Sequence, residues 1–182
     1  MTDADRFEAF VREFQDMVFA TAVRLLGNRA EAEDAAQTVF LKAFERFHDI
    51  GASPTVPGWL KTVTTNVCLN HLSRYRSRWR LFSEMDRADD KGGDGRTFEA
   101  GIAAAGSHAS DLEAADEQQR LERALRALPD HQRVPLVLFH FEDRSYQEIA
   151  DTLGVSLAKV KTDIFRGREA LKQVLTDDDG PR

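Results

Sequence analysis

The residues whose types and spacing suggest a binding function lie near the C-terminus, between Ser156 and Glu169. If this stretch is a helix, with about 100° per residue, one narrow apolar face collects Val160, Ile164, Leu171 and Leu175. The opposite face carries Ala158, Thr162, Phe165 and Glu169, flanked by Lys159, Lys161 and Arg166. Lys and Arg side chains bind phosphates and guanine edges, and a Phe ring can contact the methyl group of thymine. We therefore predict that this face binds duplex DNA, in preference to its being the solvated side of an ordinary amphipathic helix.

The preceding segment is predicted to hold this helix in a helix-turn-helix. Ser145 can cap a helix whose third residue, Glu148, completes a capping box. Its buried stripe is predicted to be Tyr146, Ile149, Ala150 and Leu153. Gly154 then ends the helix, and Ser156 is predicted to cap the next one. In such a motif the second helix enters the major groove of DNA.

The N-terminal part is predicted to consist of three helices. The first has an apolar stripe from Phe7 to Leu25 and ends at Gly27 and Asn28. The second stripe is Ala32, Ala35, Ala36, Val39, Phe40, Ala43, Phe44 and Phe47, and we expect its aromatic rings to belong to the core. A loop is predicted over residues 49–57, and Pro57 is predicted to start the third helix.

The third helix carries polar side chains that suggest a second nucleic-acid surface. Trp59, Asn66, Asn70 and His71 lie on it, and it leads into a run of alternating basic and aromatic residues: Arg74, Tyr75, Arg76, Arg78, Trp79 and Arg80. Surfaces that bind single-stranded nucleic acid combine such groups, because bases stack on aromatic rings while cations follow the backbone. The alternative is a solvated helix end at which arginines interact with the helix dipole. We favour the first interpretation.

The predicted fold class is all-α, with two small helical domains joined by a flexible linker. The domains span residues 1–82 and 111–176, and an acidic tail follows at 177–182. Residues 83–110 lack a sustained apolar period and contain five glycines, namely Gly92, Gly93, Gly95, Gly101 and Gly106. In the second domain Leu128-Pro129-Asp130 is predicted to break one helix, and Pro135 to kink or open the next.

Composition narrows the functional classes. The chain of 182 residues has a formal net charge of −6, so any DNA-binding charge must be local. Cys68, the only cysteine, is expected to be a buried structural thiol, and with no signal peptide or long apolar run we expect a cytoplasmic protein without membrane insertion. The five histidines are scattered at positions 48, 71, 108, 131 and 140. We therefore predict no catalytic, metal or cofactor site, and hence no enzyme.

Several segments resemble one protein family. Residues 145–155, followed by Val160-Lys161-Thr162 and Ile164-Phe165-Arg166-Gly167-Arg168, resemble the C-terminal domain of bacterial extracytoplasmic-function (ECF) sigma factors. Residues 128–138 match the helices that precede that motif. Residues 32–44 resemble the family's polymerase-binding helix, and residues 59–72 its promoter-opening helix. The resemblance covers nearly the whole chain except the linker.

The resemblance implies that core RNA polymerase and promoter DNA are the partners. Polymerase contacts are then expected from Asp34, Gln37, Thr38, Phe40 and Leu41. Contacts to the duplex −35 element are expected from Ser156, Ala158, Lys159, Lys161, Thr162, Phe165 and Arg166. Contacts to the melted −10 element are expected from Trp59, Asn66, Asn70, His71, Arg74 and Arg76, with Asn66 and the 49–57 loop forming a pocket for a flipped base.

Two positions depart from the family pattern, and other functions stay open. Asp163 stands where a basic or polar residue is usual, so we expect a weaker or redirected −35 contact. Thr38 replaces a usual glutamate, a change that is either tolerated or compensated by a regulatory kinase that phosphorylates Thr38. An inhibitory anti-sigma protein is a further expected partner. The alternatives are a stand-alone helix-turn-helix regulator, which would bind DNA as a dimer, and a helical adaptor that does not bind DNA.

Overall fold

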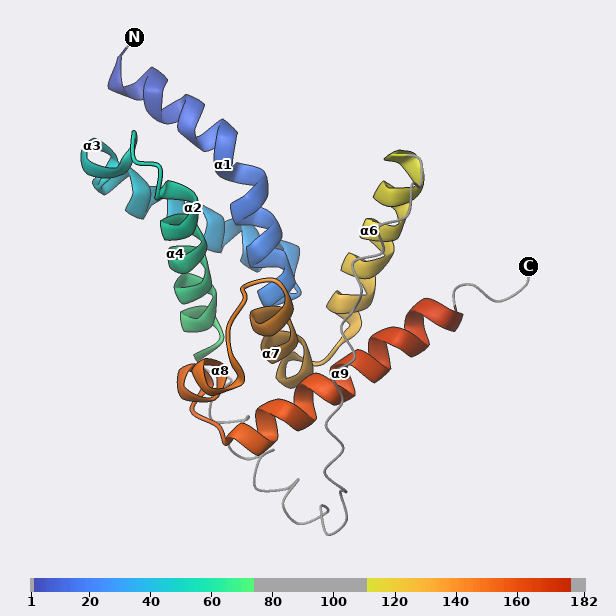
Figure 1. Cartoon of the computed structure of the whole chain (residues 1–182). Coiled ribbons are helices and arrows are strands. Elements are labelled where there is room, and N and C mark those ends of the chain that lie inside the picture. The colour runs from blue at the N-terminus through green and yellow to red at the C-terminus, as the bar shows by residue number, and fades with distance from the viewer. Residues whose placement is uncertain (1, 74–110, 178–182) are drawn as a thin grey trace.

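In the computed structural model, which describes residues 2–73 and 111–177, all regular structure within those ranges is helical (Figure 1). The N-terminal half contains α1 (Asp3–Leu26), α2 (Arg29–Glu45), α3 (Phe47–Ile50) and α4 (Val56–His71). The C-terminal half contains α6 (Asp111–Ala127), α7 (Asp130–His140), α8 (Tyr146–Leu153) and α9 (Leu157–Asp177). The all-α prediction is thus confirmed. The predicted linker, the basic run from Arg74 onward and the tail beyond Asp177 lie outside the described residues.

The N-terminal half is built from α1, α2 and α4 packed against one another. Thr2 and Asp5 form a capping box at the start of α1, and Gly27 ends that helix in the left-handed conformation, with φ of 66°. The side of α2 that faces the core bears small residues: Ala32, Ala35, Val39 and Ala43, all fully buried. Small side chains allow the backbones of neighbouring helices to approach closely. The aromatic residues of α1 and α2 therefore lie mostly at the periphery of the contact between these two helices.

Two expectations for this half are wrong in detail. Phe44 is 59% exposed, because the alanines of α2 fill the core and leave the Phe44 ring at its edge. There the ring packs edge-on against Phe7, with 4.9 Å between the two ring centres. The predicted loop is shorter at both ends, since Asp49 and Ile50 belong to α3 and α4 begins at Val56. Pro57 does occupy the first turn of α4, where a missing N–H leaves no helical hydrogen bond unmade.

The C-terminal half forms the predicted helix-turn-helix. Ser145 and Glu148 make the capping box of α8, and Gly154 ends α8 with φ of 67°. Ile149, Ala150 and Leu153 are buried as predicted, while Tyr146 is partly buried and stacks on Phe139 of α7 at 4.6 Å. Helix α7 continues through Pro135, so this proline does not end the helix.

The two halves are packed together, which the sequence did not indicate. Helix α1 contacts both α6 and α7, and the buried apolar residues of both halves form a single cluster (Figure 1). Cys68 lies within this cluster, and its burial raises the pKa of the thiol to about 12, as expected for an unreactive structural cysteine. None of the helices described here is long and apolar enough to cross a membrane.

The contact between α7 and α9 includes a histidine that can titrate. Arg168 Nε of α9 donates a hydrogen bond to His140 Nε2 of α7 at 3.0 Å, so His140 must be neutral at that nitrogen. Burial, and then the charge of Arg168, lower the pKa of His140 below its usual value. A group whose pKa is lowered on folding binds fewer protons in the folded state, so acid favours the unfolded state.

We predict that the free energy of unfolding falls as the pH drops below about 6.5, the ordinary pKa of histidine, and that His140 accounts for a measurable part of the loss. Urea unfolding at pH 7.5 and pH 5.5 measures it. His140→Gln, which retains an acceptor for Arg168, is expected to narrow the difference between the two urea midpoints. An unchanged difference in that variant would show that His140 does not carry this pH dependence.

Candidate nucleic-acid interface

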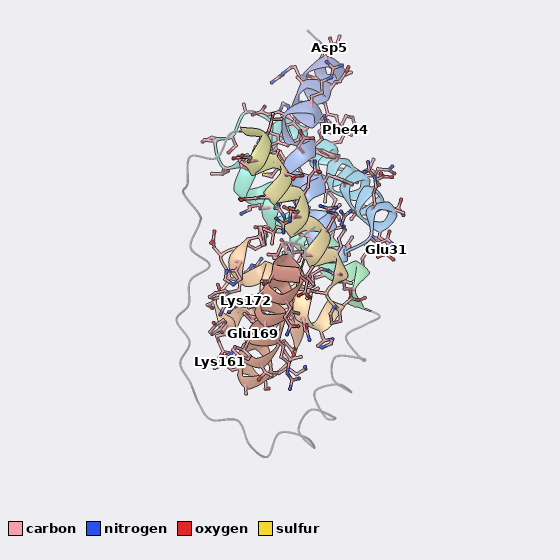
Figure 2. All side chains as sticks on the ribbon, turned by 90° about the vertical axis from the view of Figure 1, so that its right-hand side faces the viewer. Asp5, Glu31, Phe44, Lys161, Glu169 and Lys172 are labelled. Atoms are coloured by element: carbon pink, nitrogen blue, oxygen red, sulfur yellow. The ribbon has the colours of Figure 1, made fainter. Side chains whose placement is uncertain are left out.

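The exposed side of α9 matches the face predicted to bind DNA. We call it the recognition face, made up of Ala158, Lys161, Thr162, Phe165, Arg166 and Glu169; Thr162 is half-buried and the other five are exposed. Phe165 is 51% exposed. On the other side Val160, Ile164 and Leu171 are buried. Figure 2 shows Lys161, Glu169 and Lys172 following one another along the outer surface of α9.

Lys159 does not lie beside this face, and its predicted exposure is wrong. Its Nζ lies 2.9 Å from Asp163 Oδ2, and both side chains are only 5% exposed. The two residues are one helical turn apart, and each neutralises the other, which allows both to be buried on the inner side of α9. Asp163 accordingly does not reduce the positive charge of the recognition face. The sequence did contain a sign of this buried pair, because Lys159 and Asp163 have i,i+4 spacing next to the apolar stripe of α9.

Close packing on α7 fixes how α9 presents its recognition face. Ser156 Oγ accepts a hydrogen bond from Lys159 N at 3.2 Å and so caps the first turn of α9, as predicted. Further along, a Cβ atom at Gly167 would lie 3.2 Å from Leu136 Cδ1 and 3.4 Å from Gln132 O of α7. Gly167 therefore allows α9 to lie close to α7, whereas a larger residue would force the two helices apart. The sequence analysis missed this role.

A second polar surface lies where the end of α4 meets α2. An open hollow of about 400 Å³, which we call the strand hollow, is lined by Thr38, Lys42, Val67, Asn70, His71 and Ser73. It brings Asn70 and His71, both predicted to contact the −10 element, next to Lys42, which was not predicted. Asn66 is exposed on α4 and Trp59 is half-buried there, but neither they nor the 49–57 loop line the hollow. Arg74 and Arg76 lie outside the described residues.

A third surface is a groove between α1 and α2, with a volume of about 680 Å³. Gln37, Phe40 and Leu41, all predicted polymerase contacts, line it, and Leu41 is 66% exposed. The sequence analysis missed the other apolar lining residues: it assigned Phe7, Val11, Ala36 and Phe44 to the apolar stripes of the core, and it did not consider Phe19. The sequence did contain a sign of this groove: the apolar stripe of α2 is wider than its contact with the core requires.

Two predicted polymerase contacts do not line the groove. Asp34 is exposed on α2, while Thr38 lies in the strand hollow and donates a hydrogen bond from Oγ to Asp34 O at 3.0 Å. A phosphate on Thr38 would accordingly lie near Lys42 and His71 in the strand hollow and outside the α1–α2 groove. In the part of the chain that the structure describes, no cluster of three or more histidines, cysteines or carboxylates could hold a metal ion.

Comparison with known proteins agrees with the position of these surfaces along the chain. Residues 10–78 match the family model for sigma-70 region 2, and residues 118–171 match that for sigma-70 region 4. The first match contains the strand hollow and all residues that line the α1–α2 groove except Phe7, and the second contains the helix-turn-helix.

Several relatives extend over most of the chain. The chain is 30% identical to the ECF RNA polymerase sigma factor SigW of Bacillus subtilis, over 96% of this chain and 91% of SigW. It is 34% identical to the ECF RNA polymerase sigma factor SigE of Mycolicibacterium smegmatis, over 93% of this chain and 61% of SigE. Among solved structures it is similar to the sigma factor RpoE in complex with the anti-sigma factor NepR from Bartonella quintana, with 24% identity and a TM-score of 0.48 over 93% of this chain and 96% of RpoE.

SigW and this chain match along nearly their full lengths. Sigma-70 region 2 matches the N-terminal half of this chain, and sigma-70 region 4 matches the C-terminal half. The chain belongs to the ECF family of RNA polymerase sigma factors.

Proposed function

We propose that this protein acts in the cytoplasm as an alternative sigma factor that binds core RNA polymerase and directs it to promoters. The α1–α2 groove binds the polymerase, the recognition face of α9 binds the −35 element as a duplex, and the surface around the strand hollow binds the melted −10 element. The observation that carries the proposal is the recognition face itself, on which Phe165, Lys161 and Arg166 are exposed while the opposite side of α9 is buried.

The recognition face suits the major groove of DNA. An α-helix fits that groove, where Arg can bind a guanine edge and Phe can contact a thymine methyl group. Lys161 and Arg166 both lie at the exposed side of α9, on either side of Thr162 and Phe165 in the sequence. Since Lys159 is buried, we assign the phosphate contact to Lys161.

The strand hollow suits a single strand. Unstacking a base costs a few kcal/mol, so a protein that opens DNA must offer polar and cationic partners to the released strand. Lys42 supplies a positive charge from α2, while Asn70 and Ser73 supply hydrogen-bonding groups near the end of α4. We therefore add Lys42 to the residues proposed to bind the −10 element.

The α1–α2 groove suits a helical partner. Leu41 and Phe44 are exposed apolar side chains at a concave surface, and Glu33 and Gln37 add polar groups along it. An amphipathic helix binds in such grooves by inserting apolar residues at helical spacing. We propose that the clamp helices of core RNA polymerase are this partner.

Binding to promoters is expected to depend on the polymerase. The chain has a net charge of −6, and neutralisation of backbone phosphates supplies most of the affinity of proteins for DNA. In a mobility-shift assay at about 150 mM salt, the protein with core polymerase should bind a cognate promoter specifically, whereas the protein alone should bind weakly. Tight, specific binding by the protein alone as a dimer on an inverted repeat would instead identify a stand-alone regulator.

Arg166 and Lys161 should differ in what their loss does to promoter binding. Arg166→Ala should weaken binding by about 1–3 kcal/mol and relax the preference at one base pair of the −35 element. Lys161→Ala should weaken binding to all sequences alike and reduce the salt slope by about one, since it loses one phosphate contact. Affinities measured with core polymerase on promoters with single base changes, at several salt concentrations, separate the two effects.

Lys159→Ala is the structural control for this pair. It removes the buried ion pair between Lys159 and Asp163, so the free energy of unfolding should fall, with no change in base preference. If Arg166→Ala and Lys161→Ala cause equal losses on every sequence, Arg166 does not read a base.

Leu41 should contribute to polymerase binding without contributing to stability. Leu41→Ser should weaken binding of the protein to core polymerase by about tenfold or more, because a buried leucine contributes about 1.5–3 kcal/mol to an interface. Its thermal midpoint should stay within a few degrees of the wild type, since the side chain is already 66% exposed. Leu112→Ser on α6, at a residue that is 84% exposed, is the matched control. Equal losses in the two variants, measured by fluorescence anisotropy, would exclude the groove as the polymerase site.

A further inference from the structure

A cluster of five phenylalanine rings, which we call the aromatic cluster, joins α1 to the short helix α3. The ring of Phe47 packs edge-on against the rings of Phe7 and Phe10 in α1, with 5.1 and 5.4 Å between the ring centres. Phe7 and Phe10 also stack on each other, while Phe44 contacts Phe7 and Phe14 contacts Phe10. Edge-on contacts are a favoured arrangement of aromatic rings. The aromatic cluster therefore fixes the position of Phe47 relative to α1.

Helix α3 depends on two side chains for its position between the end of α2 and the start of α4 (Figure 1). It has only four residues and no side-chain hydrogen bond at its N-cap, and none of its residues is fully buried. Phe47 and Ile50 are half-buried against the apolar core, whereas His48 and Asp49 are exposed. A single helical turn has little stability of its own. The contacts of Phe47 and Ile50 therefore hold α3 against the rest of the N-terminal half.

Phe47 also contacts the residue at which the chain leaves α3. A Cβ atom at Gly51 would lie 2.7 Å from Phe47 Cε2 and 2.8 Å from Phe47 O. Any side chain at position 51 would therefore displace either the ring or the turn, and glycine allows the backbone to pass directly against the ring. The position of the Phe47 ring thus sets the path of the residues that follow Gly51.

Residues 51–55, which we call the turn segment, form a compact succession of turns. Ser53 N donates a hydrogen bond to Ile50 O at 2.8 Å, and Val56 N donates one to Ser53 O at 3.2 Å. Thr55 N donates a hydrogen bond to Ser53 Oγ at 3.3 Å, and the hydroxyl oxygens of Ser53 and Thr55 lie 2.8 Å apart. Beyond the segment, Val56 is only 3% exposed and anchors the start of α4 in the core. The turn segment is thus held between an anchor in α3 and an anchor in α4.

The turn segment offers hydrogen-bonding groups at the start of α4. Ala52, Pro54 and Thr55 are exposed, and Ser53 is half-buried. Hydroxyl groups both donate and accept hydrogen bonds, which suits the mixed donors and acceptors on the edge of an unpaired base. Helix α4 has 16 residues and is therefore about 24 Å long, with the turn segment at one end and the strand hollow at the other. A single strand that follows α4 from the hollow, past the exposed Asn66, can place a base at the turn segment.

We propose that Phe47 is a positioning residue for a promoter base: its ring holds the turn segment in the conformation that binds the base, without itself touching DNA. This inference rests on the proposed function, in which the region around α4 binds the melted −10 element. Phe7 and Phe44 line the α1–α2 groove, so changing either of them would also alter the proposed polymerase site. Phe47 is not among the residues that line the groove, so it can be changed with that site left intact.

The first test measures the mobility of the turn segment in the free protein. A spin label on Ala52→Cys reports this mobility, because the buried Cys68, whose thiol pKa is raised to about 12, does not react. Phe47→Leu removes the ring but keeps an apolar side chain, and it should increase the mobility of the label. Phe14→Leu is the matched control, since Phe14 is also half-buried and its ring contacts Phe10 of its own helix. It should leave the mobility of the label unchanged.

The second test measures base preference with core polymerase, on promoters that carry single base changes in the −10 element. Ser53→Ala should lower the preference at one position by about three- to tenfold, because it loses one hydrogen bond to a base. Phe47→Leu should lower the preference at the same position by a similar factor and leave the affinity for core polymerase unchanged. Phe14→Leu should change neither quantity. Both leucine variants are expected to lower the thermal midpoint, so base preference separates positioning from simple structural support.

A double variant tests whether Phe47 acts through the turn segment. Ser53→Ala should cause no further loss of base preference in the Phe47→Leu background, since residues that act through one contact are not additive. Fully additive losses would overturn the proposal, as would an unchanged preference in Phe47→Leu or an equal loss at every position of the −10 element.

The mobility of the label distinguishes failure of this inference from failure of the proposed function, because it needs neither DNA nor polymerase. Equal mobility in the wild type and in Phe47→Leu would overturn the positioning role of Phe47, whether or not the protein binds promoters. A turn segment that loosens in Phe47→Leu, in a protein that never binds a promoter with core polymerase, would refute the proposed function alone.

Discussion

The arrangement of the whole molecule depends on the buried guanidinium group of Arg133. It satisfies carbonyl groups at the end of α1 and, in its own half, the carbonyl of Leu128. A buried charge is tolerated only when its hydrogen-bonding capacity is met, and here the acceptors come from both halves. Arg133 thereby makes the two halves mutually dependent. Without α7, the carbonyl groups of Leu25 and Leu26 would lose the donor that Arg133 supplies, and without α1 the guanidinium group would lose these two acceptors.

The same rule explains why Lys159 and Asp163 are inside. Each would be costly to bury alone, but together they form an ion pair on the inner side of α9. The pairing removes one cation and one anion from the outer surface, which leaves Lys161 and Arg166 as the cations of the recognition face and Glu169 as its acidic residue. In a chain of net charge −6, the positive charge offered to DNA by the recognition face is therefore local and comes from Lys161 and Arg166.

The three surfaces that the proposed function uses differ in how they are positioned. The recognition face depends on the α7–α9 contact at Gly167, and the strand hollow depends on the contact between α2 and α4. The α1–α2 groove exists because the alanines of α2 fill the core and leave Phe40, Leu41 and Phe44 outside it. The α1–α2 groove and the strand hollow lie in the N-terminal half, and the recognition face lies in the C-terminal half. The interface around Arg133 therefore sets the distance between the recognition face and the other two surfaces.

The sequence alone determined the long helices, the cap of α8 and the family, since these depend on local rules: apolar spacing, Ser145 with Glu148, and glycines that end α1 and α8. It also located the recognition face, except for Lys159. Only the tertiary structure decided that Phe44 and Leu41 are exposed, that Thr38 faces the strand hollow, and that Arg133 joins the halves. These outcomes depend on which helix covers which face, and on partners such as Leu25 and Arg133 that are 108 residues apart in the chain, which no local pattern records.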